Sequence, residues 1–247
     1  MQLSGKNAVI TGATSGIGRA TALALAALGA QVLITGRDQT RGKELLEEVL
    51  AAGGAGQFLP ADLTDATSAR EFAGRALEAG DGRIDILVNN LGIGSFGTTQ
   101  STTEEAFDQM YSVNVKVPYF LVAEIAPTMA ERGDGAIVNV TTTVSGFGQA
   151  GAALYGSSKA AVALLTKAWA AEFGPSGVRV NTVSPGPTRT PGTDFMGDSL
   201  DQAAAVAPAR RVAAPKEIAD VVAFLCTDAA SFVHGATLPA DGGRSAV

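Results

Sequence analysis

The chain has 247 residues with a formal net charge of −6, and 46% of its residues are hydrophobic. This length suits one α/β domain, the hydrophobic content excludes intrinsic disorder, and the lack of a basic stripe argues against nucleic-acid binding. The single cysteine, Cys226, excludes an intrachain disulfide, lies in an apolar run and fits a reducing cytoplasm. Residues 1–12 lack a secretory-signal layout, and every uncharged stretch is too short or broken to span a membrane. We therefore expect a cytoplasmic protein without nucleic-acid or membrane partners.

Val- and Ile-rich apolar runs alternate with Ala-rich helical stretches along the chain. In chain order, the pattern predicts a strand at Asn7–Thr11, a helix at Ile17–Leu28, a strand at Gln31–Thr35, a helix at Thr40–Ala52, a strand at Gln57–Pro60, a helix at Asp65–Ala79, a strand at Ile84–Asn89, a helix at Glu104–Val115 or onward to Arg132, a strand at Ala136–Val140, a helix at Leu154–Phe173, a strand at Val178–Val183, a helix at Pro215–Cys226 and a short strand at Thr237–Pro239. This alternation predicts βαβ units with right-handed crossovers, hence a parallel sheet. Because the strands are almost continuously apolar, helices should cover both faces of that sheet.

The stretch Pro185–Arg211 differs from the rest of the chain. It is rich in Pro, Gly and Thr, and only Ser199–Val206 has a helical pattern. A segment of this length and irregularity inside a compact domain is usually a binding loop or lid. Since no repeat or linker divides the chain, we expect one domain over residues 1–247, with residues 187–211 as a substrate lid.

A glycine-rich turn follows the first predicted strand and opens the first helix. Its sequence is Thr11-Gly12-Ala13-Thr14-Ser15-Gly16-Ile17-Gly18. Glycines let the backbone come close to a pyrophosphate, and the free N–H groups of the helix N-terminus then face the negative charge. A plain strand-to-helix turn is the alternative, but the position between a strand and an amphipathic helix favours dinucleotide binding.

The spacing G-x-x-x-G-x-G resembles that of the short-chain dehydrogenases/reductases, particularly members similar to 3-oxoacyl carrier-protein reductases. Further landmarks of that family follow in the expected order: Asp62, Asn89-Asn90-Leu91-Gly92, Asn114, Tyr155-Gly156-Ser157-Ser158-Lys159, Asn181, Pro185-Gly186 and Asp241-Gly242-Gly243. The resemblance implies a single-domain Rossmann fold of the α/β class. That fold has a doubly wound parallel sheet of about seven strands in the order 3-2-1-4-5-6 plus a short seventh, with helices on both faces. It also implies a homotetramer or homodimer, with Trp169 as an interface or core anchor.

The cofactor preference depends on the end of the second predicted strand. An acidic side chain there would bind the adenosine ribose and repel a 2′-phosphate. Gly36 occupies that position here, and Arg37 offers a permanently charged fork to a phosphate. We therefore expect NADP(H) to be preferred over NAD(H). The alternative is that Arg37 is a solvated charge paired with Asp38, and Ser15 stands where many NADP-using relatives carry a second basic residue.

The resemblance implies further cofactor contacts. Asp62 would bind the adenine amino group unless it is a helix cap, a role that Thr64 or Asp65 could equally take. Leu91 replaces the usual alanine beside the cofactor and narrows the pocket. The complete expected cofactor set is Gly12, Thr14, Ser15, Gly16, Ile17, Gly18, Arg37, Asp62, Leu63, Asn90, Gly92, Tyr155, Lys159, Pro185, Gly186, Thr188 and Thr190.

Tyr155 and Lys159 are four residues apart on a predicted helix, so they face the same side. A lysine ammonium near a phenol favours the phenolate and lowers its pKa, which suits a general acid/base. The resemblance makes these two residues catalytic. It adds Thr142, where the family usually has serine, to orient the substrate oxygen. It also adds Asn114, which would hold a water near the lysine, unless this asparagine only kinks or caps its helix.

These features predict hydride transfer between NADP(H) and a small carbonyl or secondary alcohol, with Tyr155 as general acid/base. A catalytically quiet NADP(H)-binding sensor or scaffold is the alternative, suggested by Thr142 and Leu91. Other chemistry on the same fold, such as dehalogenation or epimerisation, is a third interpretation. Substrate recognition should fall in residues 94–99, 143–154 and the lid, whose small or apolar residues favour an uncharged, moderately hydrophobic carbonyl. No metal site is expected, because His234 is the only histidine and has no ligand cluster.

Overall fold

Seven parallel strands form one sheet in the order β3-β2-β1-β4-β5-β6-β7 in the computed structural model, which describes residues 2–247. The predicted order is confirmed, and the seventh strand extends the sheet beyond β6. Each crossover passes through a helix, as parallel pairing requires. The strands are β1 Asn7–Ile10, β2 Gln31–Ile34, β3 Ala55–Phe58, β4 Ile86–Asn89, β5 Gly135–Val140, β6 Val178–Pro185 and β7 Thr237–Ala240.

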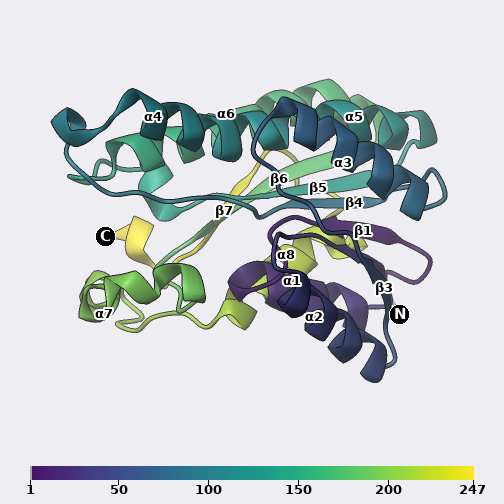
Figure 1. The fold of residues 1–247 in the computed structure, drawn as a ribbon, viewed down its shortest axis with the longest axis horizontal. Coiled ribbons are helices and arrows are strands. Elements are labelled where there is room, and N and C mark those ends of the chain that lie inside the picture. The colour runs from purple at the N-terminus through teal and green to yellow at the C-terminus, as the bar shows by residue number, and fades with distance from the viewer. Residues whose placement is uncertain (1) are drawn as a thin grey trace.

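Helices cover both faces of this sheet (Figure 1). One face carries α3 Ala66–Ala79, α4 Glu104–Tyr111, α5 Val117–Arg132 and α6 Ala153–Phe173, and the other carries α1 Gly16–Ala27, α2 Gln39–Ala51 and α8 Pro215–Cys226. Each layer has its own apolar core, with Leu25 and Ile218 in one and Phe72 and Trp169 in the other. Trp169 is only 5% exposed, so it anchors the core within a single chain. No helix found between residues 2 and 247 has the length and apolar character needed to cross a bilayer.

The helix expected from Glu104 continues to Arg132 but is not regular. A π-helical turn, Ser112–Lys116, joins α4 to α5 and contains Asn114. π turns insert one extra residue into a helix and occur frequently at functional sites. Asn114 can therefore lie at an irregularity of the helix and also have a functional role; the two interpretations do not exclude each other.

Several predicted boundaries differ from the structure by one or two residues, and the third strand is displaced as a whole. The strand expected at Gln57–Pro60 lies at Ala55–Phe58, because Ala55 and Gly56 pair with β2 and the ladder stops before Pro60, which has no N–H to donate. The segment after β6 also has more structure than expected. It contains a 3₁₀ helix over Pro191–Met196 and then the helix α7 Asp198–Ala205, one residue from the predicted position.

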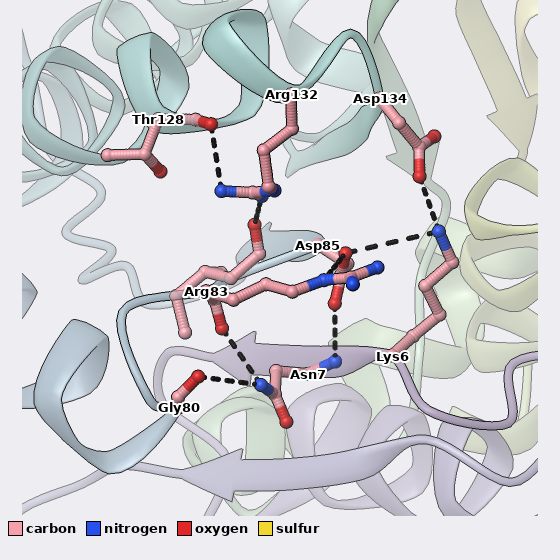
Figure 2. Close-up of polar contacts among 9 residues, drawn as sticks. Lys6, Asn7, Gly80, Arg83, Asp85, Thr128, Arg132 and Asp134 are labelled. Atoms are coloured by element: carbon pink, nitrogen blue, oxygen red, sulfur yellow. Dashed lines mark hydrogen bonds and ion pairs between the residues drawn. The ribbon is translucent and has the colours of Figure 1, made fainter.

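A buried carboxylate joins several elements near the amino ends of the central strands (Figure 2). Asp85 is 2% exposed and accepts hydrogen bonds from the Asn7 backbone N–H at 2.8 Å and from Arg83 Nε at 2.7 Å. Lys6 Nζ lies 3.9 Å from Asp85 and also pairs with Asp134, next to β5. With its charge compensated on several sides, Asp85 can be buried without a large penalty. Ion pairs and hydrogen bonds therefore join the elements at the amino ends of the strands. The opposite edge of the sheet, at the carboxyl ends, does not take part in these contacts.

Candidate active site

A cleft of about 910 Å³ opens at the carboxyl ends of the strands. Ligands of open α/β sheets bind at this edge, where the strand order reverses. The loops after β1, β2, β4, β5 and β6 all line the cleft, together with residues of the segment 187–211. It brings together all of the expected catalytic and cofactor residues except Gly18 and Asn114, which lie immediately behind its wall.

The glycine turn has the geometry that a pyrophosphate site needs. Gly12 and Gly16 have φ values of 63° and 54°, a region that side-chain-bearing residues rarely adopt. The Ser15 side chain makes no cap hydrogen bond to α1, so the first N–H groups of the helix are available to an anion. A side chain at Gly16 would lie 3.0 Å from Thr190, which places the start of the segment 187–211 directly across from the turn. These residues fit a dinucleotide.

Asn90 fixes the turn from the neighbouring strand. Its side-chain amide donates to the carbonyls of Thr11 at 2.9 Å and Gly12 at 3.1 Å. The Thr11 hydroxyl in turn accepts the backbone N–H groups of Asn90 and Leu91, both at 3.0 Å. Asn90 therefore holds the β1 and β4 loops together, in addition to any contact with a cofactor.

Replacing Gly18 with alanine is expected to weaken both folding and cofactor binding. A Cβ atom at Gly18 would lie 2.4 Å from the Gly12 carbonyl oxygen and 2.5 Å from the Asn90 amide, so the turn has to move. Such overpacking costs about 1–3 kcal/mol of unfolding free energy. Gly74→Ala is the matched control, because Gly74 lies in α3 with nothing within 4 Å of its added Cβ and should gain about 0.5–1 kcal/mol from helix propensity. Urea unfolding and dinucleotide titration measure both; a Gly18→Ala protein as stable as wild type would contradict the packing argument.

Arg37 and Arg41 line one end of the cleft, where the wall is formed by the chain that follows β2. Arg37 faces Asp62 at 3.7 Å, and both side chains are more than half exposed. The alternative in which Asp38 pairs with Arg37 is wrong, because Asp38 caps α2 and accepts hydrogen bonds from the backbone N–H and the side chain of Arg41. These two hydrogen bonds lower the pKa of Asp38. Asp62 is not a helix cap either, since Asp65 takes that role for α3. Sequence reasoning missed Arg41, although its position one helical turn after Arg37 was a usable signal.

Tyr155 and Thr142 meet in the central part of the cleft. Burial raises the pKa of Tyr155, and a hydrogen bond with the Thr142 side chain acts in the opposite direction. The shift is opposite in direction to the lowering expected from Lys159, because burial is its largest cause. A phenol is protonated near neutral pH even at its ordinary pKa, so Tyr155 can act as a proton donor.

Lys159 is buried beneath this pair. Its Nζ donates to the Val140 carbonyl at 3.1 Å, and burial lowers its pKa to about 8. A Cβ atom at Gly92 would lie 2.7 Å from this Nζ, so only glycine leaves the space that the lysine occupies. Lys159 thus lies between the β5 end and the β4 loop, in position to reach a group bound above it.

Asn114 is 1% exposed and joins the β4 loop to α6. Its Oδ1 accepts from the Ile93 N–H at 2.9 Å, while its Nδ2 lies within hydrogen-bond distance of the Ile93 carbonyl and of Ser158 Oγ. The π turn presents this side chain to both partners. Its observed contacts are positional, and a water relay through it stays a prediction.

The remaining part of the cleft has an aromatic wall. The Phe96 ring lies 5.6 Å from Tyr155 and 6.5 Å from Phe195, measured between ring centroids. Phe147 lines the same space and carries the guanidinium of Arg244, 4.7 Å from its ring centroid. The residue ranges expected to hold substrate, 94–99, 143–154 and the lid, do converge here. Arg244 was missed, although it directly follows the landmark Asp241-Gly242-Gly243.

The comparisons with known proteins agree with this geometry. A family model described as enoyl-(acyl carrier protein) reductase matches residues 12–245. A solved structure named as a short chain dehydrogenase/reductase family protein is 48% identical, covers 100% of both chains and has a TM-score of 0.92. The chain belongs to the short-chain dehydrogenase/reductase family.

Other members of the short-chain dehydrogenase/reductase family are similar over nearly the same length. The 3-oxoacyl-[acyl-carrier-protein] reductase of Thermotoga maritima is 35% identical over 244 residues, which is 98% of this chain and 99% of that protein. The structure of a blue fluorescent protein from a metagenomic library, in complex with NADPH, is 31% identical with a TM-score of 0.93, covering 99% of this chain and 100% of that one. Short-chain dehydrogenases/reductases are oxidoreductases that use nicotinamide cofactors, which fits the glycine turn described above.

Proposed function

We propose that this short-chain dehydrogenase/reductase transfers a hydride between NADP(H) and a small carbonyl or secondary alcohol. The observation that carries the proposal is the meeting of Tyr155, Thr142 and Lys159 in the cleft that also contains the glycine turn. When bound, the nicotinamide supplies or accepts the hydride at the substrate carbon. The protein then has to position the substrate and move one proton.

Each catalytic side chain has a separate task in this mechanism. Tyr155, protonated near neutral pH as phenols ordinarily are, donates its proton to the carbonyl oxygen in the reductive direction. Thr142 lines the cleft with Tyr155 and would orient the same oxygen, because the extra methyl group relative to serine does not remove the needed hydroxyl. Lys159 supplies positive charge beneath the phenolate and binds the nicotinamide ribose. Asn114 holds the Ile93 backbone against α6, which carries both Tyr155 and Lys159.

The proposed preference for NADP(H) depends on the β2 loop. Gly36 has no side chain to repel a 2′-phosphate, and Arg37 and Arg41 both line that end of the cleft. Arg37 is now paired with Asp62, and Arg41 with Asp38. Because these ion pairs are exposed and weak, N–H groups of both guanidiniums can be given over to a bound 2′-phosphate. The NADPH bound to the structural relative is consistent with this preference.

Replacing Arg37 with glutamine is expected to raise the dissociation constant of NADPH by about 10- to 100-fold, the range for one hydrogen-bonded charge. The dissociation constant of NADH, which lacks the 2′-phosphate, should change less than threefold, within about 0.6 kcal/mol. Fluorescence titration measures both cofactors, and Arg70→Gln on α3, outside the cleft, is the matched control. Tighter binding of NADH than of NADPH by the unmodified protein would refute the role given to Arg37.

The segment 187–211 is proposed as the substrate lid. It contributes Phe195, Met196 and Leu200 to the cleft, and Thr190 faces the glycine turn across it. Closure of these apolar side chains would exclude water from the reacting carbonyl. We also propose that the protein is a homodimer or homotetramer and that it acts in a reducing cytoplasm. Analytical ultracentrifugation of the purified protein tests the oligomeric state.

A further inference from the structure

Arg244 lies at the substrate end of the cleft and has unused hydrogen-bonding capacity. The residue is half-buried, and its guanidinium lies over the face of Phe147, 4.7 Å from the ring centroid. Its side chain makes one hydrogen bond, from Nη1 to a main-chain oxygen of Val247, the last residue, at 3.3 Å. In the part of the chain from Gln2 onward no acidic side chain forms an ion pair with Arg244. The edge formed by Nε and Nη2 therefore remains available as a two-pronged donor.

The charges that line the cleft are unevenly distributed. The acidic residues among them, Asp38 and Asp62, are both paired with arginines at the β2 end. Lys159 is buried under the catalytic tyrosine and directed at Val140. Among residues 2–247, Arg244 is the cation that lines the aromatic end of the cleft, and no acidic side chain lines that end beside it.

The turn that carries Arg244 is held rigidly. The Asp241 carboxylate accepts the backbone N–H groups of Gly243 and Ser245, both at 2.9 Å. The Gly242 carbonyl accepts the N–H of Ala209 at 2.9 Å, which attaches this turn to the end of the segment 187–211. Figure 1 shows the C-terminal end of the chain beside α7 accordingly. A cation on a fixed support loses little entropy on binding a ligand, so it is suited to recognition.

We propose that Arg244 binds a carboxylate of the substrate, so that the enzyme acts on oxo acids or hydroxy acids with an apolar stem. One guanidinium, without a second cation or a helix N-terminus beside it, balances the single charge of a carboxylate better than that of a phosphate. The aromatic wall of Phe96, Phe147 and Phe195 suits the stem between the carboxylate and the reacting carbonyl. This inference deepens the proposed function, on which it rests, and replaces the uncharged substrate expected from the apolar composition of the loops.

The test compares an acid with its uncharged ester. Initial rates are measured with NADPH and either 5-oxohexanoate or methyl 5-oxohexanoate, for the unmodified protein, Arg244→Gln, and the control Lys216→Gln, an exposed lysine on α8 outside the cleft. The unmodified protein should prefer the acid in kcat/KM. Arg244→Gln should lower the acid-to-ester ratio by about 10- to 100-fold, the value of one charged hydrogen bond, and Lys216→Gln should not change it. Equal efficiency with acid and ester in the unmodified protein, or a ratio unaffected by Arg244→Gln, overturns the inference.

A binding measurement separates this inference from the proposed function. Hexanoate, which has no carbonyl to reduce, should raise the thermal midpoint of the unmodified protein more than hexanamide does, and Arg244→Gln should abolish the difference. If no carbonyl is reduced but this difference is present and depends on Arg244, the hydride-transfer proposal fails and the carboxylate site stands. If hexanoate and hexanamide act alike, the carboxylate site fails whatever the enzyme reduces.

Discussion

Replacing Tyr155 with phenylalanine should lower kcat by about 10²- to 10⁴-fold, the usual contribution of a general acid/base. Phenylalanine keeps the ring that packs 5.6 Å from Phe96 and removes only the phenolic hydroxyl. Substrate and cofactor affinity should therefore change far less than kcat. The measurement is steady-state oxidation of NADPH with a panel of ketones, accompanied by cofactor titration of the same preparation.

Tyr111→Phe is the matched control for this experiment. Its hydroxyl donates to Ser157 at 3.1 Å, outside the cleft, so its removal should leave kcat within about twofold of the unmodified enzyme, as for most surface changes. Undiminished activity of Tyr155→Phe would refute the mechanism. An unmodified protein that binds NADPH but reduces none of the ketones would instead favour the sensor or scaffold alternative.

Lys159→Met should give a protein that is nearly inactive yet more stable at pH 7. Burial lowers the pKa of Lys159 to about 8, so below that pH the folded protein carries the cost of a buried ammonium. Methionine has a similar length and no charge. The substitution removes the cost of the buried charge, and it also removes the hydrogen bond to the Val140 carbonyl. The first effect is the larger, so the free energy of unfolding should rise by about 1–3 kcal/mol.

The sign of the pH dependence follows from the direction of the shift. Between about pH 8 and 10.5 the unfolded chain binds a proton at Lys159 that the folded protein does not, so the stability of the unmodified protein rises with pH. The advantage of Lys159→Met is therefore complete below pH 8 and shrinks toward pH 10.5. Urea unfolding at pH 7 and pH 9.5 measures it, with Lys167→Met, an exposed position on the same helix, as the control. A difference that does not vary with pH would show that the charge at Lys159 is not what destabilises the fold.

Most of the fold was predictable because its signals are local and periodic. Apolar strand runs alternating with amphipathic helices require parallel pairing, and right-handed crossovers then leave few strand orders. The gathering of the glycine turn, Asn90, Thr142 and Pro185 in one cleft follows from the same topology, since each lies at or just after the carboxyl end of a strand. The boundary of β3 was missed because its first residues, Ala55 and Gly56, have weak strand propensity and pair with β2 all the same.

The features that the sequence did not predict depend on tertiary contacts. Arg244 is the fourth residue from the C-terminus, and only the packing of the last turn against Phe147 and the segment 187–211 brings it into the cleft. The direction of the Tyr155 pKa was also wrong, because helical spacing puts Lys159 nearby but says nothing of how deeply the phenol is buried. Arg37 pairs with Asp62 and not with Asp38, its neighbour in the sequence, because Asp38 is the N-cap of α2.

The π turn at Ser112–Lys116 makes the site dependent on chain length as well as on residue type. Removing one residue from this turn would restore a regular helix from Glu104 to Arg132, which is locally the more favourable backbone. It would also rotate everything on one side of the deletion by roughly 100° relative to the other, since an α-helix has 3.6 residues per turn. Asn114 would then lose either Ile93 or Ser158, which it now holds together. In this protein a single extra residue in a helix is therefore part of the active-site architecture.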